Sequence, residues 1–169
     1  MRATFIIAAP LALALALTLA ACAKEAEGPT QRETIGQTWK YEGGEGAAAK
    51  VAYIGSANTM ATMTAPDTFS VLLVQPLKEG SADVTVKLVG APFTCDLSAC
   101  RITATTDDGK RHEWQGRMTE NKDGITILPS QGAYDAIRAA KNVKVDLVVG
   151  PQDKTAPFTF NVDGLAFKG

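Results

Sequence analysis

The sequence has few of the residues on which catalytic and metal sites depend. It contains one histidine, His112, with three cysteines and 7% aromatic residues in 169 positions. A single histidine excludes any metal site that needs several imidazole ligands. His112 would also be the sole base for a Ser-His-Asp triad, and none of the serines lies in a G-x-S-x-G nucleophile elbow. We therefore expect a protein that is not an enzyme and that has no cofactor.

The sequence also lacks an excess of positive charge. It has 17 Lys and Arg residues against 18 Asp and Glu residues, which gives a formal net charge of −1. Proteins that bind nucleic acid depend on clustered Lys and Arg residues to neutralise phosphates. The charge balance therefore argues against a nucleic-acid partner. The 46% hydrophobic and 21% charged residues are typical of a globular domain.

Methionine sulfur offers a further set of soft metal ligands. Met60, Met63 and Met118 could form a copper site with His112. Methionines at such spacings more often pack against a core, so we favour that interpretation. His112 lies two positions before Trp114 in an alternating segment, so both side chains share one strand face. We expect an ordinary surface histidine there.

The first 21 residues have the pattern of an export signal. A short positive segment with Arg2 precedes residues 5–21, which are apolar, uncharged and end in small residues. Leu19-Ala20-Ala21-Cys22 resembles the lipobox of bacterial lipoproteins. The resemblance implies cleavage before Cys22 and a diacylglycerol on its sulfur, and two or three acyl chains would make the membrane anchor permanent. The alternative is a plain secretory signal with a cysteine near its cleavage site.

The residues after Cys22 indicate location and domain organisation. Ala23, rather than Asp, follows the cysteine, which resembles the outer-membrane default of enteric bacteria. We expect an envelope protein anchored in the outer membrane and facing the periplasm. Residues 23–38 are polar, without apolar periodicity, and predict a flexible tether that reaches about 20–25 Å. The predicted organisation is a signal peptide at 1–21, the lipidated cysteine and tether at 22–50, and a β-domain at 51–169.

Alternation of apolar and polar residues dominates the chain after the tether. Val84, Val86 and Leu88 share one strand face, and Phe158 and Phe160 share another. Such alternation predicts strands that bury one face. The predicted strands span residues 51–56, 68–75, 83–89, 92–95, 100–105, 111–119, 124–128, 143–149 and 156–162. About six residues separate the last two strands, too few for a parallel crossover, so we expect them to pair antiparallel.

One segment has helical spacing instead. Tyr134, Ile137 and Ala140 recur every three residues within 131–141, Ser130 is a candidate N-cap, and Asn142 can close the helix in the left-handed conformation. Eight or nine strands with one short α-helix predict a mainly β fold. The expected architecture is a single β-sandwich or open barrel.

Two turn sequences separate predicted strands. Asp107-Asp108-Gly109-Lys110 and Asn121-Lys122-Asp123-Gly124 predict hairpin loops in which the glycine takes positive φ. The aspartate pair of the first loop could suggest calcium. It lacks the D-x-D-x-D-G spacing of a calcium loop, so an ordinary turn is favoured.

Cys95 and Cys100 remain once Cys22 is assigned to lipid. An even pair in an exported chain predicts a disulfide, and four intervening residues let a hairpin bring the two Cα atoms to about 5.5–6 Å. The alternative is a redox pair. Thioredoxin-like motifs use C-x-x-C at the start of a helix, whereas this pair is C-x₄-C between strands.

Two stretches of the chain resemble a known family. They are Phe93-Thr-Cys95-Asp-Leu-Ser-Ala-Cys100-Arg-Ile and the segment from Tyr134 through Phe158-Thr-Phe-Asn-Val-Asp-Gly164-Leu165. Together they resemble the C-terminal half of invasion-associated locus B type proteins and related bacterial envelope domains. The resemblance covers residues 93–167. It implies an exported β-sandwich domain and carries over no catalytic residue.

These observations predict a cell-envelope lipoprotein whose non-catalytic β-domain binds an envelope protein or a cell-wall component. The lipobox, the tether and the absence of an acid/base constellation support this interpretation. An alternative is a periplasmic inhibitor or immunity protein that inserts a loop into the cleft of a lytic enzyme. The loop between Cys95 and Cys100, or the polar loop at 152–155, could serve that purpose.

Overall fold

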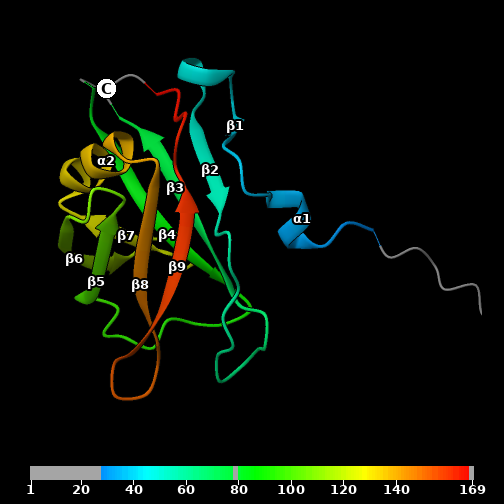
Figure 1. Cartoon of the computed structure of the whole chain (residues 1–169), viewed down its shortest axis with the longest axis vertical. Coiled ribbons are helices and arrows are strands. Elements are labelled where there is room, and N and C mark those ends of the chain that lie inside the picture. The colour runs from blue at the N-terminus through cyan, green and yellow to red at the C-terminus, as the bar shows by residue number, and fades with distance from the viewer. Residues whose placement is uncertain (1–27, 78–79, 168–169) are drawn as a thin grey trace, which may run out of the picture.

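The computed structural model describes residues 28–77 and 80–167 and shows a mainly β architecture, as predicted. Figure 1 shows the arrangement of its elements. The strands are β1 (Lys40–Glu42), β2 (Val51–Gly55), β3 (Phe69–Pro76), β4 (Ala82–Val89), β5 (Cys100–Thr106), β6 (Arg111–Met118), β7 (Ile125–Leu128), β8 (Asn142–Gly150) and β9 (Lys154–Asn161). The helices are α1 (Gln31–Ile35), α2 (Ser130–Ala139) and a short 3-10 turn, η1 (Gly46–Ala48).

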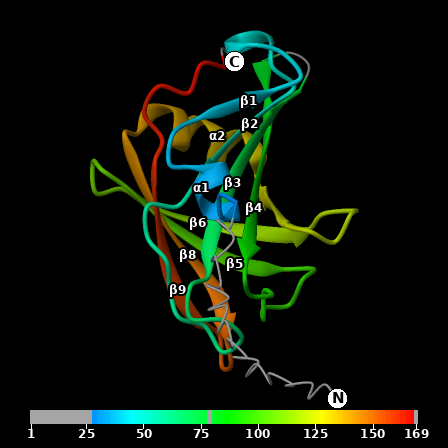
Figure 2. The same cartoon turned by 90° about the vertical axis from the view of Figure 1, so that its right-hand side faces the viewer.

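All nine strands form one antiparallel sheet in the order β1-β2-β3-β4-β7-β6-β5-β8-β9. Its two halves are joined by β4 and β7, which pair over only two positions, Thr85 with Thr126 and Val86 with Ile125. We call β1–β4 the N-terminal half-sheet and β5–β9 the C-terminal half-sheet. The sheet is not closed, and it bends so that β8 and β9 lie across from β3 and β4 (Figures 1 and 2). This is the predicted open form.

The core lies between the inner faces of the two half-sheets. Val143 pairs with Phe160 and Val145 with Phe158, which confirms the antiparallel pairing of β8 and β9. Phe158 and Phe160 are fully buried, whereas Asn161 is exposed. Period-two alternation was therefore a sound guide to which side chains of these strands enter the core.

Helix α2 covers the core near the place where the half-sheets join. Ala133, Tyr134 and Ile137 are buried, as their spacing predicts, and the Tyr134 hydroxyl donates to the Phe167 carbonyl at 3.1 Å. The predicted caps were wrong. The helix already begins at Ser130, whose hydroxyl donates to the Ile127 carbonyl. Asn142 begins β8, because the chain leaves the helix through an extended residue and needs no left-handed one.

Helix α1 corrects the predicted tether and the predicted domain boundary. The expected organisation had a flexible segment up to residue 50 and one helix in the chain. Instead Thr30 and Glu33 form a reciprocal capping box that begins a five-residue helix. The sheet then starts at β1, whose Lys40 pairs with Tyr53, so the folded domain extends well before residue 51. Short polar helices of this kind escape a search for apolar periodicity.

Side chains bridge the two edges of the open sheet. The Asn58 amide donates to the Pro157 carbonyl, and its oxygen accepts from the Thr159 amide, both at 2.8 Å. Near the other end of β9, the Trp39 indole donates to the Val162 carbonyl at 3.0 Å. The outer edge of β9 is thereby occupied without a tenth strand. Occupied edges protect a sheet from pairing with other chains.

Candidate functional site

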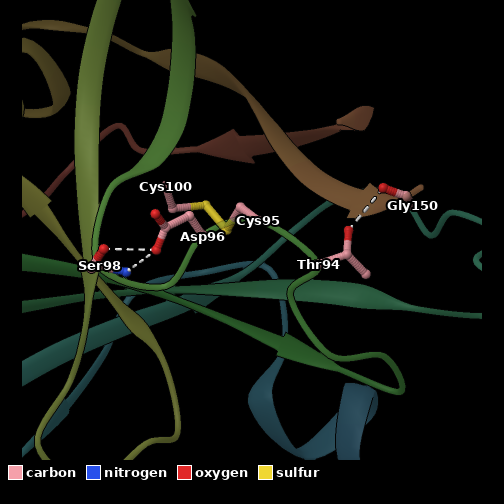
Figure 3. Close-up of a disulfide and its surroundings, with 6 residues drawn as sticks. All are labelled: Thr94, Cys95, Asp96, Ser98, Cys100 and Gly150. Carbon is pink, nitrogen blue, oxygen red and sulfur yellow. Dashed lines mark hydrogen bonds between the residues drawn. A yellow bond between two sulfur atoms is a disulfide. The ribbon is translucent and has the colours of Figure 1, made fainter. Parts of the chain in front are cut away.

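The structure brings Cys95 and Cys100 together, as predicted. Their sulfur atoms lie within bonding distance and their Cα atoms are 5.2 Å apart (Figure 3). Residues 92–95 are not a strand, which corrects the expectation of a hairpin. Asp96 instead accepts hydrogen bonds from the amide and the hydroxyl of Ser98, and these shape the loop. The same bonds hold the pKa of the Asp96 carboxyl below its usual value. Cys22, the predicted lipidation site, lies outside the described residues.

His112 and the methionines do not assemble into a site. His112 is half-buried and stacks on Trp114, with ring centroids 5.4 Å apart, so the two do share a face. His112 is a partly exposed strand histidine, and Ala136, Ala139 and Ala140 at the end of α2 lie beside it. Met63 is 77% exposed, whereas Met60 and Met118 pack against the core. Within residues 28–77 and 80–167, no group of three or more His, Cys, Asp or Glu side chains could hold a metal ion.

The aspartate pair at the β5–β6 turn is used for local structure. Asp107 accepts from the Lys141 amide at 2.9 Å, which ties the turn to the end of α2. Asp108 accepts from the Thr106 hydroxyl and forms an ion pair with Lys110. Both carboxyl pKa values are lowered, that of Asp107 mainly by the Lys141 amide and that of Asp108 mainly by Lys110. These contacts stabilise the β5–β6 turn, so both aspartates have a structural role there.

A hollow of about 850 Å³ lies on the outer face of the N-terminal half-sheet. It runs across β2, β3 and β4 to the β6–β7 hairpin. A second hollow of about 380 Å³ continues it toward α1, and the two share Val51, Leu73, Lys87 and Asp123. We call the combined surface the β2–β4 groove. Figure 2 shows α1 in front of the strands of the N-terminal half-sheet.

The floor of the β2–β4 groove is apolar beside Val51 and Leu73, and it is polar along β4, where Asp83, Thr85 and Lys87 line it. Val51 and Tyr53 project from β2, and Val71 and Leu73 from β3, on the face opposite the core. Val71 is 6% exposed, although it does not enter the core between the half-sheets. Burial raises the pKa of the Tyr53 hydroxyl, and the neighbouring Glu42 carboxylate raises it further, burial having the larger effect. Tyr53 therefore stays neutral at physiological pH and offers an apolar ring to the groove.

The β6–β7 hairpin forms the opposite wall. Asp123 accepts from Lys87 Nζ at 2.5 Å and from the Thr119 hydroxyl at 2.8 Å. The Lys87 contact is the main reason why the pKa of the Asp123 carboxyl is lowered. Gly124 lets the hairpin come this close, because a Cβ there would meet the Val86 carbonyl oxygen at 3.0 Å. Its φ is not positive, contrary to expectation, and Lys122 takes the left-handed conformation instead.

The rim of the groove carries charges of both signs. Asp83, Arg117 and Glu120 line it beside the Lys87–Asp123 pair. Among the described residues, these three side chains form no ion pair. A floor that is partly apolar, with charged side chains beside it, suits a partner that offers both apolar groups and polar contacts.

Sequence reasoning did not single out this groove. A signal was present in β3, where Phe69-Ser-Val-Leu-Leu-Val is apolar at both even and odd positions. Continuous apolar runs mark strands that are covered on both faces. Among the described residues, α1 lies over part of the outer face of β3, and the groove is the part that stays open.

No helix within the described residues is long and apolar enough to cross a membrane. Comparison of the chain with protein-family models, with curated proteins and with solved structures gave no match. The resemblance to invasion-associated locus B type proteins therefore stays a prediction.

Proposed function

We propose that the chain is a cell-envelope lipoprotein whose non-catalytic β-domain binds an envelope protein or a cell-wall component in the β2–β4 groove. Lipid on Cys22 holds it in the membrane, which we take to be the outer membrane, with the domain in the periplasm. The lipobox supports the anchor. The observation that carries the binding function is the open groove, in which the apolar Val51 and Leu73 lie beside Asp83 and Arg117, two charges that form no ion pair among the described residues.

The anchor has a direct test in Cys22→Ser. This variant should lose all incorporation of a palmitate analogue and accumulate as an unprocessed precursor, because the thiol that receives the lipid is gone. Wild-type protein in the same cells is the control. Label retained on the variant would refute the lipoprotein assignment.

The groove is tested by Leu73→Glu, which places a charge on the apolar floor. The mature domain carrying this change should sediment with isolated cell envelopes at least about tenfold less than the wild type, because apolar contact and its desolvation are lost. The matched control is Thr105→Glu, on the outer face of the C-terminal half-sheet, which should bind normally. Thermal melts of both variants establish that they fold. Equal binding by all three proteins would refute the groove as the site.

A second function rests on the cysteine loop. Leu97 is 36% exposed, and the Cys95–Cys100 bridge and the Asp96 contacts fix the loop that presents it. A rigid loop with an exposed apolar tip can enter an enzyme cleft at low entropic cost. This would make the protein an inhibitor of a lytic enzyme. The purified domain should then slow lysozyme, and Leu97→Asp should abolish the effect while leaving envelope binding intact.

A further inference from the structure

The strand register places the outward side chains of the β2–β4 groove in rows across the sheet. Tyr53 on β2 lies opposite Leu73 on β3, and Leu73 lies opposite Thr85 on β4. Thr85 lies opposite Thr126 on β7, which in turn lies opposite Arg117 on β6. Neighbouring strands are about 4.8 Å apart, so this row spans about 19 Å along the sheet. Its side chains change from apolar to hydroxyl-bearing to charged.

The polar side chains of this surface are free to bond to a ligand. Gln75 and Asp83 lie opposite each other in the next row. Within the part of the chain that the structure describes, the side chains of Gln75, Asp83 and Arg117 make no hydrogen bond or ion pair. Thr85 and Thr126 share a long contact of 3.5 Å between their hydroxyl oxygens. An amide, a carboxylate, a guanidinium and two hydroxyls can together donate and accept hydrogen bonds.

Charge and topology restrict what the groove can bind. The carboxylates of Asp83 and Glu120 would repel an anionic ligand, and Arg117 would repel a cationic one. The groove lies on the face of the sheet, where β3 pairs with β2 on one side and with β4 on the other. An extended peptide gains affinity by adding a strand to a free sheet edge, and β3 has a neighbour on both edges. Both restrictions favour an uncharged ligand whose polar groups do not form a β-ladder.

A glycan of N-acetylated sugars has this chemistry. Each hydroxyl both donates and accepts, so it can bond to a carboxylate and to a guanidinium at the same time. The C–H faces of the rings and the methyl groups of the acetamides are apolar, and they can cover Tyr53 and Leu73. The change from apolar to polar side chains along the row therefore matches a sugar ring with an apolar face and a hydroxyl-bearing edge.

We propose that the β2–β4 groove binds the uncharged glycan strand of the cell wall, with its N-acetyl sugars lying across β3 and β4. This rests on the proposed binding function, and it selects the wall component rather than an envelope protein as the partner. Tyr53 and Leu73 contact the apolar faces of the sugars. Asp83 and Arg117 bond to their hydroxyls.

The test measures binding of a hexasaccharide of N-acetylglucosamine to the full chain, purified in detergent, by isothermal titration calorimetry. The variant Asp83→Ala/Arg117→Ala removes one charge of each sign from the groove. Its matched control, Lys144→Ala/Asp146→Ala, removes the same two charges from the outer face of β8. The groove variant should bind at least about tenfold more weakly than the wild type and the control, because two hydrogen-bonding partners are lost. Thermal melts establish that both variants fold.

A second ligand tests the acetamide groups without any variant. Cellohexaose has the same linkage and length, but a hydroxyl replaces each acetamide, so it lacks the methyl groups that cover Tyr53 and Leu73. It should bind at least about fivefold more weakly than the N-acetylated hexasaccharide, because less apolar surface is buried. Equal affinities would overturn the inference.

Isolated cell-wall sacculi separate this inference from the proposed function. The full chain should pellet with sacculi, and an excess of the N-acetylated hexasaccharide should release it. Failure of this hexasaccharide to bind, equal binding by the groove variant, or release from sacculi by free wall peptides instead would overturn the inference. Each of these results leaves the proposed function standing if Leu73→Glu still lowers sedimentation with whole envelopes.

Discussion

The outer faces of the two half-sheets differ in how they meet solvent. On β6 of the C-terminal half-sheet, Glu113 and Gln115 are exposed while Trp114 is buried. Exposed and buried side chains therefore alternate along this part of the strand. On β3 of the N-terminal half-sheet, the positions from Phe69 through Leu72 are buried without a break. Alternation thus marks a strand with one wet face, and an unbroken apolar run marks one that needs cover on both. Helix α1 provides part of that cover, and the groove is where cover is missing.

The inner faces of the two half-sheets pack on one shared core. A change in that core should therefore destabilise both half-sheets. Phe160→Ala should lower the free energy of unfolding by about 3–5 kcal/mol, because it removes a fully buried ring from the shared core. Thr159→Ala, on the opposite face of β9, should cost well under 1 kcal/mol. Thermal melts of the mature domain measure both. Equal effects would contradict the register of β9.

The sequence was sufficient for the parts of the fold that follow period-two alternation. The antiparallel β8–β9 pair, the buried face of α2 and the Cys95–Cys100 contact were all predicted from local patterns. In each case, the residues that carry the pattern are close together in the chain.

The rest depends on contacts that a single stretch of sequence does not display. Helix α1 has no buried residue, and its docking depends on the absence of a side chain at Gly55, some 20 residues away. The Thr30–Glu33 capping box was a readable signal for its start, and it was outweighed by the polar composition of the segment. The groove arises where β3, α1 and the β6–β7 hairpin meet, so no one of them could reveal it.

The cysteine loop links the two half-sheets, since it lies between β4 and β5. Cys95→Ala should lower stability by about 2 kcal/mol or somewhat more, because the short closed loop no longer restricts the unfolded chain. Leu97→Ala in the same loop should change stability by no more than about 0.5 kcal/mol. Urea unfolding measures both. Native protein whose Cys95 and Cys100 react with an alkylating reagent before reduction would contradict the bridge.

The hydrogen bonds between Asn58 and the edge of β9 can be tested separately from the core. Asn58, which follows β2, pairs with the edge of β9 through one donor and one acceptor. Asn58→Asp keeps the acceptor but turns the donor into a carboxylate facing the Pro157 carbonyl. The loss of a partly buried hydrogen bond should cost about 1–3 kcal/mol. Asn161→Asp, exposed on β9, is the matched control and should have little effect. Comparable losses in chemical denaturation would show that the Asn58 contact does not join the edges.

The smallest expected effect concerns the ion pair at the groove wall. Asp123 has a lowered pKa in the folded protein, chiefly through Lys87, so its ionised form stabilises the fold at pH values above the pKa of an unfolded aspartate, about 3.9. Because its side chain is 47% exposed, water screens the pair and the contribution should stay below about 1 kcal/mol.

The pH dependence distinguishes this contribution from a general surface effect. The stability difference between wild type and Asp123→Asn should be constant above about pH 5 and shrink as pH falls from about 4 through the lowered pKa, because Asp123 then takes up a proton. In a Lys87→Gln background, most of this pH-dependent difference should disappear, leaving the part due to Thr119. Urea unfolding at a series of pH values gives both curves. A difference that grows on acidification would mean that the carboxyl is not stabilised in its charged form, and that the hairpin is held against β4 by apolar contact alone.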